Sequence, residues 1–196
     1  MMVNYPNGLK RNSMASLEVK KQDTSGRGYS LENALNASNE FYLTFNKAVI
    51  HKKPTPVQIV KVDYPSRNKA KITEAYFKIP STTDYNGLYR GCYIDFEAKE
   101  CRRKHFPFQN IHPHQIEHLK KVIEHGGIAF LVVAFFHINE VYLIEASYVI
   151  KKYNDPTFKS MSYDEIKENG HLIKQGYNPQ LDYLKVVDQV FFKEVK

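Results

Sequence analysis

The sequence predicts an α/β protein in which helices flank a mixed central β-sheet. The expected elements follow one another as helix, strands, helix, strand and helices, an order that is typical of this class. Residues 128–136 form a continuous apolar run that suits a strand covered on both faces at the centre of a sheet. The 196 residues, of which 42% are hydrophobic and 13% aromatic, are enough for the core of one domain.

The charge balance favours a polyanionic partner. Lys and Arg number 28 against 21 Asp and Glu, which gives a formal net charge of +7 and a pI near 9.2. This profile makes nucleic acid the leading class of partner. No apolar run reaches the ~18 residues of a spanning helix, and no signal peptide is visible. We therefore expect a cytoplasmic protein without a membrane association. Cys92 and Cys101 are too few for a disulfide framework.

Residues 1–28 are predicted to form a flexible, basic N-terminal arm. Asn, Ser, Gly, Lys and Gln dominate this segment, and its apolar residues show no period. A solvated tail and an arm that contacts DNA both fit this composition. Residues 29–196 are expected to form a single domain. Its first element is a helix that begins after Ser30, a candidate N-cap, and runs to about residue 46.

Two extended stretches, residues 57–64 and 72–78, are predicted to pair as a β-hairpin. A short strand at residues 48–50 precedes them, and the turn-forming residues 65–69 connect them. Residues 52–78 hold seven Lys or Arg and only two acids, so the local charge is +5. A hairpin with so polar a surface need not lie in the core. We expect it to project from the domain as an inserted stalk.

The second half of the chain is predicted to complete the sheet and its helical layers. A strand at residues 88–99 precedes a helix that starts at Pro113 and stops at Gly126 and Gly127. Residues 141–146 are expected to pair with the apolar strand at residues 128–136. Helices follow, one of them with a capping box at Ser162 and Glu165. The apolar faces are predicted to consist of Ile116, Leu119 and Ile123 in the helix after Pro113, and of Leu181, Leu184, Val187 and Phe191 in the last helix.

Chemistry is concentrated on the strand that includes residues 93–99. Side chains alternate along a strand, so Asp95, Glu97 and Lys99 share one face. Charged groups on an inner strand are costly unless they are paired or bind something. Asp84 lies in the turn before this strand, where a hairpin-like return places it beside Glu97. Asp84, Glu97 and Lys99 together form the pattern D-x12-E-x-K.

This pattern suits the hydrolysis of a phosphodiester. Two carboxylates can hold Mg²⁺, which prefers oxygen ligands and keeps several waters. The cation lowers the pKa of bound water and offsets charge at the transition state, and a lysine on the same strand can add to that stabilisation. The pattern alone is weak and by itself favours a surface salt-bridge ladder on an edge strand. The basic hairpin, the strand placement and the following helix together favour a nuclease.

Four longer blocks resemble one known family. They are HKKPTPVQIV at residues 51–60, STTDYNG at 81–87, YIDFEAKE at 93–100 and HQIEH at 114–118. These blocks look like the RecU family of Holliday junction resolvases, and the likeness runs from about residue 26 to the final helix. The resemblance implies a restriction-endonuclease-like fold, a homodimer, and Mg²⁺, with Mn²⁺ as a possible substitute. It also implies symmetric nicking of four-way DNA junctions in recombination, repair and chromosome segregation, in the bacterial cytoplasm at the nucleoid, with a RecA-type recombinase as a possible partner.

The resemblance also implies a role for individual residues. Thr82, Asp84, Glu97 and Gln115 would form the metal site, and Lys99 would stabilise the transition state. The hairpin would be a stalk that enters the junction centre, and the basic residues expected to contact DNA there are Lys52, Lys53, Arg67, Lys69, Lys71 and Lys78. Thr83 precedes Asp84 where the wider nuclease superfamily has proline. Proline is no metal ligand, so this departure leaves the chemistry intact.

Two other functions fit parts of the sequence. One is a DNA-binding or bridging module in which the acidic cluster is only structural. The other is a zinc peptidase, because HQIEH satisfies H-x-x-E-H and a helix would place His114 and His118 one turn apart. A peptidase explains neither the basic hairpin nor the set of Asp84, Glu97 and Lys99.

Single residues also leave alternatives open. Gln115 fits direct metal coordination and an indirect role about equally. Asp95 is expected to be structural and to pair with Arg90 or Arg103. Phe106 and Phe108 could stack on unpaired bases, although covering the edge of the core suits them better.

Overall fold

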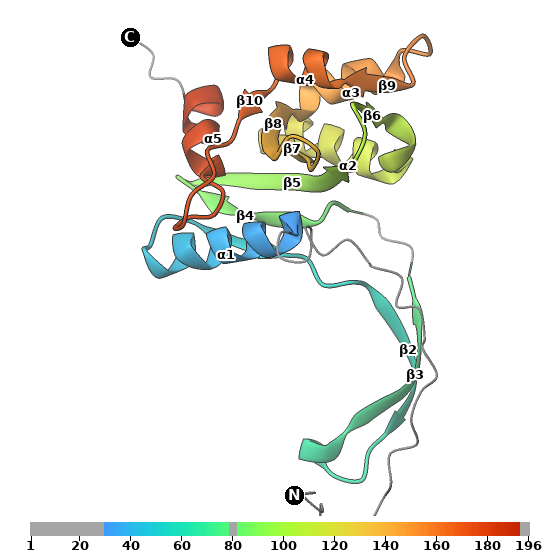
Figure 1. Cartoon of the computed structure of the whole chain (residues 1–196). Helices are drawn as coiled ribbons and strands as arrows, with labels where there is room; N and C mark the ends of the chain where they lie inside the picture. Colours follow the sequence, from blue (N-terminus) through green and yellow to red (C-terminus); the bar gives the residue numbers. More distant parts are fainter. Residues whose placement is uncertain (1–29, 79–81, 193–196) are drawn as a thin grey trace, which may run out of the picture.

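A six-stranded mixed sheet forms the centre of the protein, as seen in a computed structural model that describes residues 30–78 and 82–192 (Figure 1). The central pair, β5 and β7, is parallel, and every other neighbouring pair is antiparallel. In spatial order the strands are β1 (Val49–Lys52), β4 (Tyr85–Tyr89), β5 (Cys92–Cys101), β7 (Ile128–Phe135), β8 (Glu140–Glu145) and β10 (His171–Leu172). The predicted fold class is confirmed. The predicted arm at residues 1–28 lies outside the described residues.

Helices cover both faces of this sheet (Figure 1). One face packs against α1 (Leu31–Thr44) and α5 (Tyr183–Phe191), and the other against α2 (Pro113–Glu124), α3 (Ala146–Asn154) and α4 (Tyr163–Asn169). All eight residues of β7 are buried. Its continuous apolar sequence is therefore explained by a position between two helical layers.

The alternation along β5 sorts its side chains between the two faces. Ile94 and Phe96 belong to the core beneath α1 and α5, where Phe96 stacks on Tyr85 with the ring centroids 4.8 Å apart. Asp95 and Glu97 point to the opposite face, toward α2, and both are buried. Two carboxylates thus lie inside the protein, where each one needs a partner.

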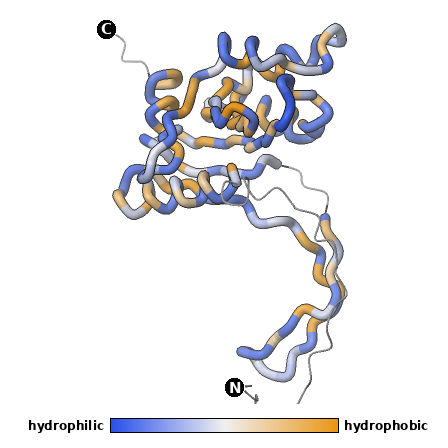
Figure 2. The backbone as a smooth tube through the Cα atoms, viewed as in Figure 1, coloured by the Kyte–Doolittle hydropathy of each residue, from blue (hydrophilic) through white to orange (hydrophobic). Residues whose placement is uncertain are grey.

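The predicted hairpin forms a separate two-stranded sheet that projects from the body (Figure 1). Its strands are β2 (Val57–Asp63) and β3 (Lys71–Phe77), joined by a 3₁₀ turn at Arg67–Lys69. Every residue of both strands is exposed. Hydrophobic and hydrophilic residues are interspersed along it (Figure 2). At its foot the backbone N–H of Lys53 donates to the carbonyl of Asp84 over 2.7 Å.

The single strand predicted at residues 88–99 is wrong, because two antiparallel strands meet in a tight turn there. Arg90 and Gly91 occupy the turn with φ of 50° and 79°, the left-handed conformations that a two-residue hairpin turn requires. Asn or Asp commonly fills the first of these positions, so Arg90 conceals the turn signal. The resulting register pairs Tyr85 with Phe96 and brings Asp84 beside Glu97.

The helix after Pro113 is confirmed, but one residue of its predicted apolar face is wrong. Val122 takes the buried position beside Leu119, while Ile123 is 38% exposed. The capping box predicted for α4 is half formed. Ser162 Oγ accepts from the Glu165 N–H over 3.1 Å, while the Glu165 carboxylate is bonded elsewhere, to Tyr148 and Lys152.

Two short strands complete the fold beside α2. They are β6 (His105–Pro107) and β9 (Ser160–Ser162), which pair as an antiparallel ribbon. Across the described ranges, 30–78 and 82–192, no helix has both the length and the apolar character needed to cross a membrane.

Candidate functional site

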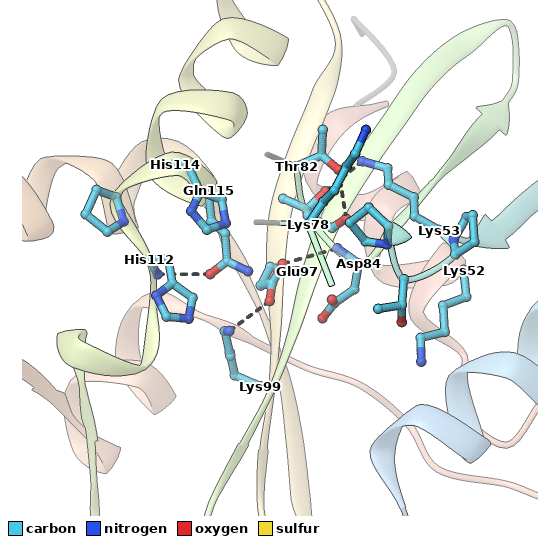
Figure 3. Close-up of a pocket in the computed structure, with 15 residues that line it drawn as sticks. Lys52, Lys53, Lys78, Thr82, Asp84, Glu97, Lys99, His112, His114 and Gln115 are labelled. Carbon is cyan, nitrogen blue, oxygen red and sulfur yellow. Dashed lines mark hydrogen bonds and ion pairs between the residues drawn. The ribbon is translucent and has the colours of Figure 1, made fainter. Parts of the chain in front are cut away.

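A cleft of about 710 Å³ opens between the foot of the hairpin and the N-terminus of α2. Strand β5 supplies the floor through Glu97 and Lys99. Figure 3 shows its labelled lining residues on two sides of Glu97 and Lys99: His112, His114 and Gln115 on one, and Lys52, Lys53, Lys78, Thr82 and Asp84 on the other. The four predicted metal-site residues and Lys99 are therefore brought together.

Asp84, Glu97 and Lys99 form one connected set. The Lys99 ammonium lies 2.8 Å from Glu97 Oε1. The backbone N–H of Asp84 donates to Glu97 Oε2 over 3.2 Å, and the N–H of Ala98 donates to Asp84 Oδ2 over 3.4 Å. These contacts follow from the antiparallel register of β4 and β5, which places the two acids opposite each other. One ion pair and two backbone hydrogen bonds thus link the two acidic residues and the lysine.

The Glu97 carboxyl binds its proton unusually tightly. Burial is the main cause, and repulsion from Asp84 adds to it, while Lys99 acts in the opposite direction. Together they raise the pKa of Glu97 to about 7. A positive charge placed between the two acids would favour the ionised form of Glu97. The pair therefore has the electrostatic character of a cation site.

The donor set fits a hard divalent cation. Asp84 and Glu97 offer carboxylate oxygens, and Thr82 adds a hydroxyl at the wall of the cleft. Among residues 30–78 and 82–192, no three His, Cys, Asp or Glu side chains are grouped to hold a metal. A cation here would keep several water or phosphate oxygens as ligands, as Mg²⁺ does.

Gln115 lies at the rim of this site with its carbonyl already engaged. Its Oε1 accepts from the His112 N–H over 3.0 Å, which closes a capping box at the N-terminus of α2. The side chain is 6% exposed and lines the cleft. This contact supports a role in shaping the site, and direct coordination of a metal stays a prediction.

Asp95 is the centre of a buried polar network beside the cleft. Its Oδ2 receives the Lys53 ammonium at 2.8 Å and the Tyr93 hydroxyl at 2.8 Å, and lies 3.0 Å from His118 Nε2. Thr83 donates its hydroxyl to Oδ1. Burial raises the pKa of Asp95, but these hydrogen bonds outweigh it and hold the pKa below its usual range.

The predicted partners of Asp95 are therefore wrong. Arg90 pairs instead with Asp188, with 2.9 Å between Nη1 and Oδ1. Besides Tyr93 on the same strand, the actual partners come from the segment after β1, the segment before β4 and helix α2. Sequence spacing gave no sign of these long-range contacts, although the need of a buried acid for partners was visible.

The basic residues predicted to bind DNA occupy different environments. Lys53 is committed to Asp95 and Thr83, and Lys52 pairs with Glu32. Lys78 lines the cleft, while Lys69 and Lys71 are exposed on the hairpin. Arg67 belongs to the hairpin turn. DNA contacts by these residues stay a prediction, and Lys53 has a structural role that the sequence did not indicate.

The interpretation of HQIEH as a zinc-binding motif is wrong. His118 faces Asp95 rather than a shared site with His114. The His114 ring stacks on His112, with centroids 5.4 Å apart. Burial, His112 and Lys99 lower the pKa of His114. In the described part of the chain, neither ring belongs to a group of three His, Cys, Asp or Glu side chains that could hold a metal.

The aromatic and cysteine side chains near the site have structural positions. Phe106 and Phe108 are buried in the core beneath α2 and α3, so covering the core is their role. Cys92 and Cys101 are both free thiols. His112 is a lining residue that the sequence analysis missed, and its position directly before Pro113 was the available signal.

Comparison with known proteins adds independent information on this chain. The family model of RecU, described as Recombination protein U, matches residues 26–189. The proteins named Holliday junction resolvase RecU from Bacillus thuringiensis (strain Al Hakam) and Bacillus cereus (strain AH820) are each 52% identical over 199 residues, which covers 98% of this chain and 100% of theirs. The solved structure of Hjc, a Holliday junction resolvase from Archaeoglobus fulgidus, aligns with 70% of this chain and 94% of its own at a TM-score of 0.43 and 7% identity.

The family match and the relatives define the class of the protein, which is an endonuclease. The match covers nearly all of the described residues, including the cleft and the hairpin. The chain belongs to the RecU family of Holliday junction resolvases. The resemblance noted in the four sequence blocks is confirmed.

Proposed function

We propose that this protein resolves four-way DNA junctions by Mg²⁺-dependent nicking of two opposing strands at symmetric positions. The observation that carries the proposal is the contact of Asp84, Glu97 and Lys99 in a cleft at the foot of a basic hairpin. The relatives at 52% identity are named Holliday junction resolvases, which supports the junction as substrate. The proposed reaction is hydrolysis of a phosphodiester.

Each residue of the cleft has a proposed task in this reaction. Asp84 and Glu97 would hold the cation, with Thr82 and Gln115 at its border, and Mn²⁺ would serve as a substitute. When bound, Mg²⁺ supplies positive charge that offsets the charge developing on the phosphate. The Lys99 ammonium, which pairs with Glu97 Oε1, would add a positive charge of the protein next to the same phosphate. His112 and His114 bound the space that the phosphate enters.

The hairpin is proposed to give the enzyme its preference for branched DNA. It projects from the same end of the sheet that holds the cleft (Figure 1). Lys69 and Lys71 are exposed at its outer part, where they can contact phosphates at the centre of a junction. Linear duplex DNA has no such centre for the hairpin to enter. Contacts of the hairpin would therefore increase the affinity for junctions more than the affinity for linear duplex.

We propose an assembly and a cellular setting that match this activity. Two symmetric cuts require two active sites related by a two-fold axis, which a C2 homodimer provides. A branched DNA substrate supports a proposed setting in the cytoplasm at the nucleoid, in recombination, repair and chromosome segregation. A RecA-type recombinase, which generates branched intermediates, is a proposed partner.

Cleavage of a synthetic immobile four-way junction tests the proposal. We expect Mg²⁺ and Mn²⁺ to support paired nicks at symmetric positions of opposing strands, with intact linear duplex as the control. Ca²⁺ should support binding without cleavage. Binding with no cleavage in any of these metals would instead support a non-catalytic bridging module.

A further inference from the structure

A second cavity, of about 760 Å³, adjoins the catalytic cleft on the side away from the hairpin. The two share His112 and Pro113, at the N-terminus of α2, as a common wall. The ribbon of β6 and β9 forms the far side. In Figure 1 this ribbon and the foot of the hairpin lie at the same end of the sheet, on opposite sides of β5. A strand that leaves the cleft away from the hairpin therefore meets this cavity.

The charged side chains among the described residues that line the cavity are all basic, and they lie beside apolar and uncharged ones. Arg103, His105 and Lys159 line it and are exposed, and no Asp or Glu is among its described lining residues. Arg103 lies next to two further exposed bases, Arg102 and Lys104. The first cleft, by contrast, combines its lysines with Asp84 and Glu97. A surface that carries positive charge without a carboxylate suits a phosphate chain rather than a cation.

Aromatic packing fixes the shape of this basic surface. The Lys152 ammonium lies 3.9 Å from the centroid of the Phe158 ring, which lines the cavity, and 2.8 Å from Glu165 Oε1. These contacts fix the position of the Phe158 ring. Tyr153 packs against Phe108 with centroids 5.7 Å apart. Side chains that are already ordered lose little conformational entropy when a ligand binds.

We propose that this second cavity, named here the arm groove, binds the phosphate backbone of the duplex arm that adjoins the scissile phosphate. Arg103 and Lys159 are the contact residues, and His105 borders them. The proposal rests on the proposed function, because it assigns one arm of the junction to a surface outside the cleft and the hairpin. It divides DNA binding between the hairpin, which takes the junction centre, and the arm groove, which takes the arm.

The test combines a protein change with a change in the DNA. Junction binding is measured in Ca²⁺ for wild type, for Arg103→Ala with Lys159→Ala, and for Lys185→Ala, which removes an exposed charge on α5 across the sheet. Each protein is tested on a junction with four long arms and on junctions with either opposing pair shortened to a few base pairs. Melting temperatures establish that the three proteins are equally folded.

We expect wild type and Lys185→Ala to lose affinity when one pair of arms is shortened. The double variant should bind the full junction more weakly, with a salt dependence lower by about 0.9 per lost phosphate contact, and should lose nothing more on shortening that pair. Additive losses, or unchanged affinity of the double variant, would overturn the proposal. Wild-type nicking of the full junction is measured alongside, so failure of the arm groove is distinguished from failure of the nuclease assignment.

Discussion

Glu97 loses its proton less readily than an ordinary glutamate does. It is 1% exposed, and its pKa is raised from 4.5 to about 7 by burial and by Asp84. Between these two values the folded protein binds more protons than the unfolded chain does. The contribution of Glu97 to the stability of the metal-free protein therefore falls as the pH rises from 4.5 to about 7, by a total of about 3 kcal/mol.

Glu97→Gln should remove this pH dependence. In metal-free buffer at pH 8 we expect the variant to be more stable than wild type, by up to about 3 kcal/mol. At pH 4.5 the difference should vanish, because the wild-type carboxyl is then protonated. Urea unfolding in a chelator at both pH values measures the effect, with the exposed Glu117→Gln as the control. An equal gain at both pH values would show that the effect is one of packing.

The same cleft residues should separate cleavage from binding. Asp84→Asn and Glu97→Gln keep the side-chain shape but remove charge that a cation needs, so cleavage should collapse while junction binding in Ca²⁺ persists. Lys99→Ala should lower the single-turnover rate by ~10²–10³. Higher Mg²⁺ should rescue Glu97→Gln better than Lys99→Ala, because only the former weakens metal affinity. Wild-type rates in the two acid variants would place the active site elsewhere.

Residues could be predicted from the sequence where local geometry sufficed. The strand period placed Glu97 and Lys99 on one face, and the expected chain return put Asp84 beside them. The partners of Asp95 could not be predicted, since Lys53 lies 42 positions away and reaches it only through the tertiary fold. A buried acid without a visible partner predicts that a network exists but not its members.

The hairpin is the element whose contribution can be measured most directly. Lys69→Ala with Lys71→Ala should weaken junction binding and lower the slope of log Kd against log salt by about 0.9 for each lost phosphate contact. Binding to linear duplex should change less, because the hairpin would act at the junction centre. Lys185→Ala on α5 is the matched control. An unchanged slope would mean that these two lysines do not contact DNA.

The ion pair of Lys53, at the hairpin foot, with Asp95, beside the cleft, should show as a thermodynamic coupling between the two residues. Asp95→Asn leaves Lys53 without a full charge partner in a mostly buried position, at a cost of about 3 kcal/mol in unfolding free energy. Lys53→Met should cost far less in the Asp95→Asn background than alone. Lys52→Met, which breaks a more exposed pair with Glu32, should cost about 0–1 kcal/mol. Additive losses at Lys53 and Asp95 would contradict the link.

Helices and strands could be predicted where the apolar pattern was clear or where Pro and Gly marked the ends of an element. Strand β7 was evident from an apolar run, and α2 from Pro113 and the glycine pair. The turn between β4 and β5 was missed because Arg90 takes a left-handed conformation that favours other residues. That turn sets the register that brings Asp84 beside Glu97. The residues of the site could therefore be predicted, whereas the boundary between the two strands that carry them could not.

At the scale of the whole molecule, the proposed symmetric cuts predict a stable dimer. Light scattering should give about 46 kDa, twice the 22.9 kDa of the chain, at micromolar concentration. Mixing Glu97→Gln chains with wild type should yield dimers that nick one strand without the paired cut. Full paired cleavage by a species of one chain would contradict the two-fold arrangement.

The two ends of the hairpin are joined to each other where they meet the body, so the hairpin can change in length without moving the body. Lys52 pairs with Tyr85 in the sheet, and the Lys53 N–H bonds to the Asp84 carbonyl directly beyond that pair. The chain thus leaves and re-enters the body at adjacent points, so β1 and β4 keep their register whatever the intervening segment does. Insertions and deletions between these points are tolerated far better than within β4 or β5. A change in hairpin length would therefore leave Asp84 and Glu97 in place beside each other.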